Sequence, residues 1–165
     1  MTSSYRFDHR SKEEFAKEIK EYTFEERRLL ELWLTLIEKQ TGKKPAFKDI
    51  GCGNSGELLK DSEVSSAPDF DVDGYGLIEV KFSKPLIKEN FHLKVSQVNQ
   101  YLKKGNVTIL MVNGSDGIIP EFTLLFEENL KQIKKFCEKV PFYGFGGKIA
   151  FKIPIKLFEW TPLSI

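Results

Sequence analysis

Residues 68–82, PDFDVDGYGLIEVKF, contain the strongest structural signal in the chain. Apolar and polar residues alternate on both sides of Asp73-Gly74, and an Asp-Gly pair between two such runs is typical of a β-hairpin. The stretch therefore predicts two antiparallel strands joined at Asp73-Gly74. Because side chains two apart on a strand share a face, Glu79 and Lys81 should point the same way while Val80 points into the opposite layer.

Folding this hairpin brings Asp69 toward the Glu79–Lys81 end of the partner strand. Two carboxylates and one ammonium group then lie close together. Mg²⁺ prefers oxygen ligands and keeps several waters, so two carboxylates plus a phosphate oxygen make an adequate site. Lys81 could hold or help deprotonate an attacking water, or offset charge on the phosphorus, and the sequence leaves these roles open.

The segments around the hairpin predict helices and further strands. Ser11-Lys12-Glu13-Glu14 and Thr23-Phe24-Glu25-Glu26 both fit the capping box, so each should open a helix, the second at 24–41. Apolar spacing and chain breakers predict the remaining elements: a helix at 92–104, a strand at 107–112, a strand at 122–126, a helix at 127–138 and a β segment at 149–159. We expect an α/β or α+β fold, a mixed sheet flanked by helices, in one domain spanning 1–165.

Composition limits the class of protein. The chain has 165 residues, of which 41% are hydrophobic, enough for one domain with its own core. Cys52 and Cys137 form no zinc-binding pattern, and a reducing cytoplasm is the expected location. No apolar run approaches the roughly 20 residues that cross a bilayer, so no membrane association is expected.

The net charge of +1 hides a strong separation of charge along the chain. Residues 13–38 hold eight acidic and four basic side chains, and residues 57–79 hold seven acidic side chains against Lys60. Residues 81–104 hold six lysines against Glu89, and residues 131–156 hold seven against Glu138. This pattern indicates basic surfaces on either side of an acidic centre, suited to a phosphate backbone.

Pro68-Asp69, a ten-residue step and Glu79-Val80-Lys81 resemble the signature of the PD-(D/E)XK nuclease superfamily, which includes restriction and homing endonucleases and junction resolvases. The resemblance implies that Asp69 and Glu79 bind Mg²⁺, with Mn²⁺ as a substitute, and that Lys81 assists the hydrolytic water. It also implies a restriction-endonuclease-like core across about residues 24–113.

Two further features are similar to patterns in that superfamily. Gln97 and Tyr101 resemble the Q-x-x-x-Y motif of RecB-type members and, one helical turn apart, can share a face toward the site. The superfamily often adds an upstream glutamate to the metal ligands. Glu38 is favoured by its spacing and Glu57 by its glycine-rich surroundings, Glu31 is a third candidate on the face of Glu38, and Asp71 is a plausible additional ligand.

These observations together predict a Mg²⁺-dependent DNA endonuclease of phage, homing or restriction type. Asp69, Glu79, Lys81 and Gln97 are the predicted catalytic residues. A symmetric homodimer would cleave both strands of a duplex. The alternatives are a Holliday-junction resolvase and a non-catalytic nucleic-acid-binding domain. The residues predicted to contact DNA are Lys84, Lys88, Lys94, Tyr101, Lys103 and Lys104.

Overall fold

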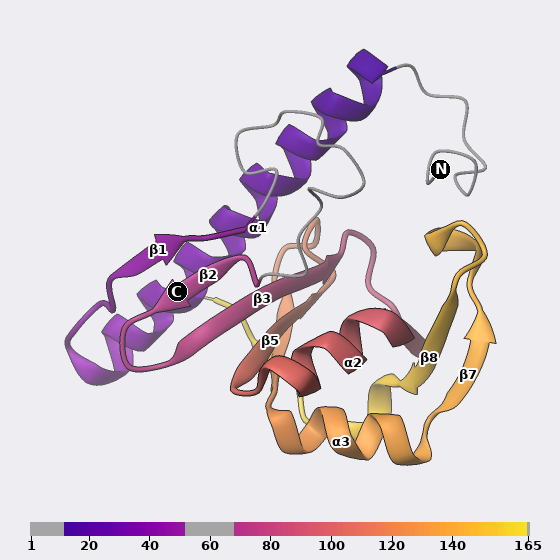
Figure 1. The fold of residues 1–165 in the computed structure, drawn as a ribbon. Helices are drawn as coiled ribbons and strands as arrows, with labels where there is room; N and C mark the ends of the chain where they lie inside the picture. The colour runs from indigo at the N-terminus through magenta and orange to yellow at the C-terminus, as the bar shows by residue number, and fades with distance from the viewer. Residues whose placement is uncertain (1–11, 52–67, 165) are drawn as a thin grey trace.

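The arrangement of helices around two sheets is seen in Figure 1, a computed structural model that describes residues 12–51 and 68–164. Within these residues the chain is an α/β protein with a mixed six-stranded sheet, a three-stranded antiparallel sheet and three α-helices. Helix α1 (Lys12–Thr41) lies on one side of the large sheet, and α2 (Val95–Lys104) and α3 (Glu127–Phe136) lie on the other. The predicted mixed sheet flanked by helices is confirmed.

The six-stranded sheet is built outward from the predicted hairpin. Its strands in spatial order are β1 (Phe47–Asp49), β2 (Phe70–Val72), β3 (Gly76–Ser83), β5 (Val107–Asn113), β6 (Glu121–Leu125) and β9 (Thr161–Pro162). Strands β3 and β5 run parallel, and all other neighbours are antiparallel. A parallel pair needs a crossover connection, which the segment containing α2 supplies.

The hairpin itself forms as predicted. Phe70 pairs with Ile78 and Val72 with Gly76, and the Tyr75 N–H donates to the Val72 carbonyl at 2.9 Å. Gly74 has φ +81°, the left-handed conformation that glycine adopts without steric cost. This tight turn fixes the register, and with it the position of Asp69 opposite the Glu79 end of β3.

One long helix replaces the two helices that the capping boxes predicted. Helix α1 runs without interruption from Lys12 to Thr41, through Thr23. No proline or glycine interrupts that segment, and a capping-box pattern without a chain breaker does not stop a helix. The predicted end of the helix is confirmed, since Gly42 has φ +83° and its N–H donates to the Glu38 carbonyl. Among the described residues, no helix has the combination of length and apolar character that a membrane span requires.

The large sheet is buried on both faces. Leu30, Trp33 and Leu34 of α1 pack against Val80 of β3 and its neighbours on one face. Val98 of α2 and the apolar side of α3 pack against the other. β5 contributes to both cores because its side chains alternate, Ile109 and Met111 on one side and Leu110 and Val112 on the other.

Most of the remaining differences from prediction lie in the second sheet or next to it. Its strands, in spatial order, are β4 (Asn90–Lys94), β8 (Ile149–Pro154) and β7 (Glu138–Pro141). The predicted helix at 92–104 begins only at Val95, because Phe91 and Leu93 alternate with polar residues and pair with β8. The predicted helix at 127–138 ends at Phe136, and the predicted β segment at 149–159 passes into a 3₁₀ turn at Ile155–Leu157. The sequence did not predict β1, β7 and β9, since each is short and largely exposed.

Candidate metal centre

Three carboxylates converge where α1 crosses the hairpin. They belong to Glu26 on α1, Asp69 immediately before β2 and Glu79 on β3. One oxygen atom from each lies within 4.8 Å of the others. Glu79 is only 5% exposed. The fold therefore concentrates acidic groups at a partly buried point, as the hairpin geometry predicted for Asp69 and Glu79.

The Asp69 carboxylate is hydrogen-bonded to the backbone of β3, just beyond the last paired residues of β2 and β3. Pairing between β2 and β3 reaches Phe70 and Ile78, and Asp69 Oδ2 accepts a hydrogen bond from the next free N–H, that of Val80, at 2.9 Å. The Asp69 carbonyl accepts from the N–H groups of Ile50 at 3.0 Å and Gly51 at 3.2 Å. Because both its backbone and its side chain are bonded, Asp69 is fixed in relation to β3.

Lys81 lies beside the carboxylates and is fixed by α2. Its Nζ is 3.4 Å from Glu79 Oε2 and donates to Gln97 Oε1 at 2.9 Å. Val80, between them on the strand, is buried in the core beneath α1. Glu79 and Lys81 therefore share a face, as predicted, and Gln97 is positioned to orient the ammonium group.

Tyr101 is buried beside Glu79. It is 2% exposed, and its hydroxyl group donates a hydrogen bond to the Glu79 carboxylate. Gln97 and Tyr101 thus face the site from the same side of α2, as their spacing predicted. The prediction that Tyr101 contacts DNA is wrong, because the side chain is enclosed between α2 and β3 and its hydroxyl orients Glu79 instead.

The crowding of the carboxylates changes their acidity. Burial raises the pKa of Glu26 to about 9, and repulsion from Asp69 adds to the rise. Burial also raises the pKa of Glu79 to about 7, an effect that the Lys81 charge opposes. The pKa of Asp69 is raised by burial, against the Val80 hydrogen bond. At neutral pH, Glu26 therefore carries a proton and donates a hydrogen bond to Asp69.

The third carboxylate is not the one that sequence spacing favoured. Glu38 and Glu31 are exposed on α1, and neither belongs to the cluster. Glu57 lies outside the described residues. Among the described residues the cluster contains Glu26 and not the predicted Glu38, and the phase of the helix explains why. Glu26 precedes Leu30, Trp33 and Ile37 by four, seven and eleven residues, which puts it on the buried stripe of α1. Glu31 and Glu38 share a face, but it is the exposed one.

The other predicted residues lie outside the carboxylate cluster. Asp71 is exposed and is not part of the carboxylate group. Lys94 is partly buried, with its Nζ 5.3 Å from the centroid of the Phe145 ring. The remaining predicted DNA contacts are exposed lysines whose role stays a prediction: Lys84, Lys88, Lys103 and Lys104.

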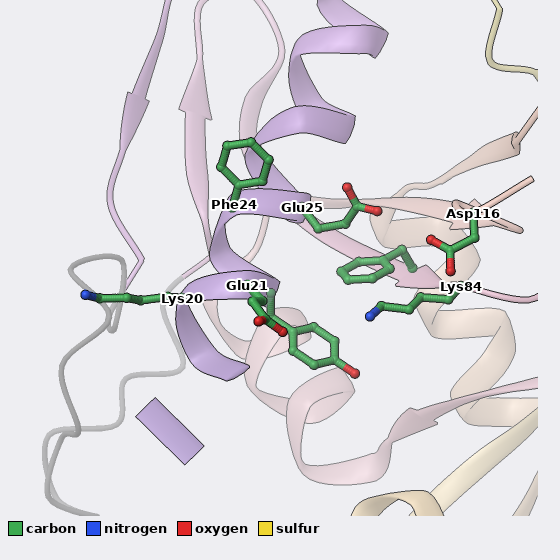
Figure 2. A pocket seen from close by; sticks show the side chains of 8 residues that line it. Lys20, Glu21, Phe24, Glu25, Lys84 and Asp116 are labelled. Carbon is green, nitrogen blue, oxygen red and sulfur yellow. The ribbon is translucent and has the colours of Figure 1, made fainter. Parts of the chain in front are cut away.

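A hollow of about 530 Å³ lies next to the site, between α1 and the end of β3. Figure 2 shows the side chains that line it, with Glu25 of α1 facing Lys84 and Asp116. Phe82, which follows Lys81, lines the hollow, and its ring lies 5.4 Å from that of Tyr22. Since both signs of charge line this hollow, it does not provide a uniformly basic path for a phosphate backbone.

Carboxylate oxygens at this spacing are the ligands that Mg²⁺ and Mn²⁺ prefer. A divalent cation would also offset the cost of burying these carboxylates in their charged form, which is the main cause of their raised pKa values. The donor set therefore fits such an ion. Comparisons of the chain with protein-family models, with curated proteins and with solved structures find no match. The residues and their geometry carry the functional inference.

Proposed function

We propose that this protein is a Mg²⁺-dependent endodeoxyribonuclease with a site of the PD-(D/E)XK type. The observation that carries the proposal is the convergence of Glu26, Asp69 and Glu79 beside the Lys81 ammonium group. The element order α1, β2, β3, α2 and β5 agrees with the core that the motif resemblance implies. We therefore also propose a restriction-endonuclease-like core for about residues 24–113.

The three carboxylates would hold the cation. A bound divalent ion supplies charge that polarises a phosphate oxygen and lowers the pKa of a coordinated water. Asp69 and Glu79 are fixed by Val80 and Tyr101, so two ligands are already oriented before an ion arrives. Glu26 would lose its proton on binding and contribute the third carboxylate.

Lys81 is the group best placed to act on the reacting phosphate. Its ammonium stays close to Glu79 because Gln97 accepts one of its hydrogen bonds. From there it can stabilise negative charge developing on the phosphate and orient the attacking water. In the reaction, a bond forms from the water oxygen to phosphorus and one phosphorus–oxygen ester bond breaks. The proton lost by the water is balanced by one taken up by the departing oxygen.

DNA would approach along lysine-rich surfaces. Lys84 and Lys88 follow β3, while Lys103 and Lys104 end α2, and all four are exposed. Such contacts position a phosphate backbone without reading its sequence. Among the described residues there is one carboxylate cluster, sufficient for one strand. Cleavage of both strands would then require two copies of the chain, which we propose form a symmetric dimer.

Cleavage of supercoiled plasmid and of a synthetic four-way junction tests the proposal. We expect Mg²⁺-dependent cleavage that stops in EDTA and falls by about 10²-fold or more in Asp69→Asn and Lys81→Gln. A strong preference for the junction would identify a resolvase. Cleavage that persists in EDTA and in both variants would contradict the proposed site. DNA binding without cleavage under all conditions would identify the non-catalytic alternative.

A further inference from the structure

A cavity of about 340 Å³ opens directly beside the proposed catalytic residues. Lys81 and Gln97 line it, and Lys81 Nζ lies 3.4 Å from Glu79 Oε2, so the cavity borders the carboxylate site. Its volume is near the lower limit of about 300–1,000 Å³ for small-molecule sites. The cavity thus has room for one small ring system next to a phosphate held at Lys81.

Aromatic rings form much of the cavity wall. The His92 ring stacks on Phe142 with centroids 3.8 Å apart and planes 13° apart. Phe142 meets Phe145 edge to face at 5.0 Å, and Trp160 meets Phe91 edge to face at 6.1 Å. All five rings line the cavity. Rings arranged in this way are the surfaces on which bases of single-stranded nucleic acids stack.

Polar side chains also line the cavity among the aromatic rings. Asn90, His92 and Gln97 each contribute to the lining and are partly exposed. Burial lowers the pKa of His92, and the nearby Lys152 charge lowers it further, so the imidazole is neutral at pH 7. A neutral imidazole and two amides can both donate and accept hydrogen bonds. A nucleobase edge carries both hydrogen-bond donors and acceptors, so these side chains can pair with it.

The end of the cavity formed by β5 is rigid. Asn113 is buried, and its Oδ1 accepts from Ser83 Oγ at 2.9 Å and from the Ile87 N–H at 2.8 Å. Its Nδ2 donates to the Ile87 carbonyl at 2.9 Å. These bonds tie the ends of β3 and β5 to the loop that follows β3. The cavity is accordingly a preformed feature of the fold.

We propose that this cavity binds one unpaired nucleobase of the DNA strand whose adjacent phosphate lies at the carboxylate cluster. The proposal rests on the proposed nuclease function for the identity of the ligand. A base fits because its faces are apolar and stack on rings, whereas its edges are polar. The nearby charges Lys81, Lys94 and Lys152 favour a ligand that carries phosphate.

The size of the cavity defines the substrate class. It has room for one base and not for a base pair with two attached backbones. The strand at the site is therefore single-stranded, or duplex DNA that is locally unpaired, as at a frayed end or a branch point. A base inside a regular duplex would have to leave the stack, which costs free energy.

Intrinsic fluorescence tests this binding without any cleavage. The chain has two tryptophans: Trp160 lines the cavity, and Trp33 is buried in the core beneath α1. In EDTA, titration with dAMP should quench the emission of the wild-type protein but not that of Trp160→Phe. Deoxyribose 5-phosphate, which lacks the base, should leave the emission unchanged.

A matched pair of phenylalanine variants tests the stacking surface. Phe142→Ala should weaken binding of dAMP and of single-stranded oligonucleotides by roughly 5- to 150-fold. Phe126→Ala removes an aromatic side chain that is 53% exposed and outside the cavity, and should bind as the wild type does. Thermal unfolding of both variants shows whether each is folded.

The possible results separate the two proposals. Equal quenching by dAMP and deoxyribose 5-phosphate, or unchanged affinity in folded Phe142→Ala, would overturn the base site even if DNA is cleaved. Binding of dAMP in the cavity without any nuclease activity would support the base site while the nuclease fails. With active enzyme, an abasic position next to the cleaved phosphate of a single-stranded oligonucleotide should slow cleavage in the wild type, and no effect would contradict the proposal.

Discussion

Replacing Glu26 with glutamine should stabilise the protein without metal and greatly weaken its stabilisation by metal. In the folded protein at pH 7, the Glu26 carboxyl is protonated and donates to Asp69, because its pKa is raised to about 9. In the unfolded chain the same group ionises near pH 4.5. Glutamine can donate the same hydrogen bond from its amide with no proton to take up.

The expected gain follows from proton linkage. At pH 7, Glu26 of the wild-type chain must take up a proton when the chain folds. The free-energy cost of that uptake is about 1.4 kcal/mol for each pH unit above 4.5, which gives an upper value of about 3 kcal/mol. We expect Glu26→Gln to raise the free energy of unfolding by about 1–3 kcal/mol, and the midpoint by several degrees. In the wild type, the stability that protonated Glu26 gives the fold is fully present below pH 4.5. It falls as the pH rises and is lost through about pH 9.

Thermal unfolding in EDTA and in Mg²⁺ measures both effects. Saturating Mg²⁺ should stabilise the wild type by about 2.7 kcal/mol at 100 times its dissociation constant, and Glu26→Gln far less. Glu38→Gln on the same helix is the matched control, because Glu38 is exposed and outside the cluster. It should change stability by no more than about 0.5 kcal/mol and should retain the Mg²⁺ response.

One pattern of results would refute the reasoning. If Glu26→Gln is less stable than the wild type in EDTA and gains as much from Mg²⁺, then Glu26 has a structural role and does not hold the ion. A pH dependence of stability that is identical in the two proteins would show that Glu26 is not protonated in the fold.

Three further predictions concern protons, orientation and DNA. Mg²⁺ affinity should increase from pH 7 to pH 9, because binding displaces the Glu26 proton. Calorimetry in two buffers of different ionisation enthalpy should detect up to one proton released per bound ion. A measurement without proton release would contradict this prediction. Tyr101→Phe removes a hydrogen bond that lowers the Glu79 pKa, so the acidic limb of the pH profile of cleavage should move to higher pH. The cleavage rate should also fall by about 10–100-fold. A shift of the acidic limb to lower pH would contradict the role of Tyr101 in orienting Glu79. The double variant Lys103→Gln, Lys104→Gln should reduce the slope of log affinity against log salt by about 2, and an unchanged slope would place DNA elsewhere.

Local patterns were enough to predict the central part of the fold. The Asp73-Gly74 turn and the alternation around it gave the hairpin, the register and the shared face of Glu79 and Lys81. The pattern at 92–104 was misleading because Leu93 fits both a strand and a helix. Its pairing with Phe151 of β8, 58 residues later in the chain, decided for the strand. Contacts over that distance leave no trace in a local window.

The sequence predicts mainly those residues of the candidate site that lie on the hairpin or on the helix that follows it. Asp69, Glu79 and Lys81 lie on that hairpin, and Gln97 lies on the following helix. Glu26 depends on how α1 crosses the sheet, which residue spacing does not reveal. Its position on the buried stripe, among Leu30 and Trp33, was the available signal, since an acidic residue there needs a partner. The sequence predicts a DNA contact for Tyr101, because it does not show that the Tyr101 hydroxyl is hydrogen-bonded to Glu79.

The most direct test of the central claim compares plasmid cleavage by Glu26→Gln and Glu38→Gln across a Mg²⁺ titration. Both variants remove one carboxylate from α1, but only Glu26 belongs to the cluster with Asp69 and Glu79. We expect Glu38→Gln to cleave like the wild type and Glu26→Gln to lose activity by about 10²-fold or more, with partial recovery at high Mg²⁺. Equal activity of the two variants, or greater loss in Glu38→Gln, would contradict the proposed centre.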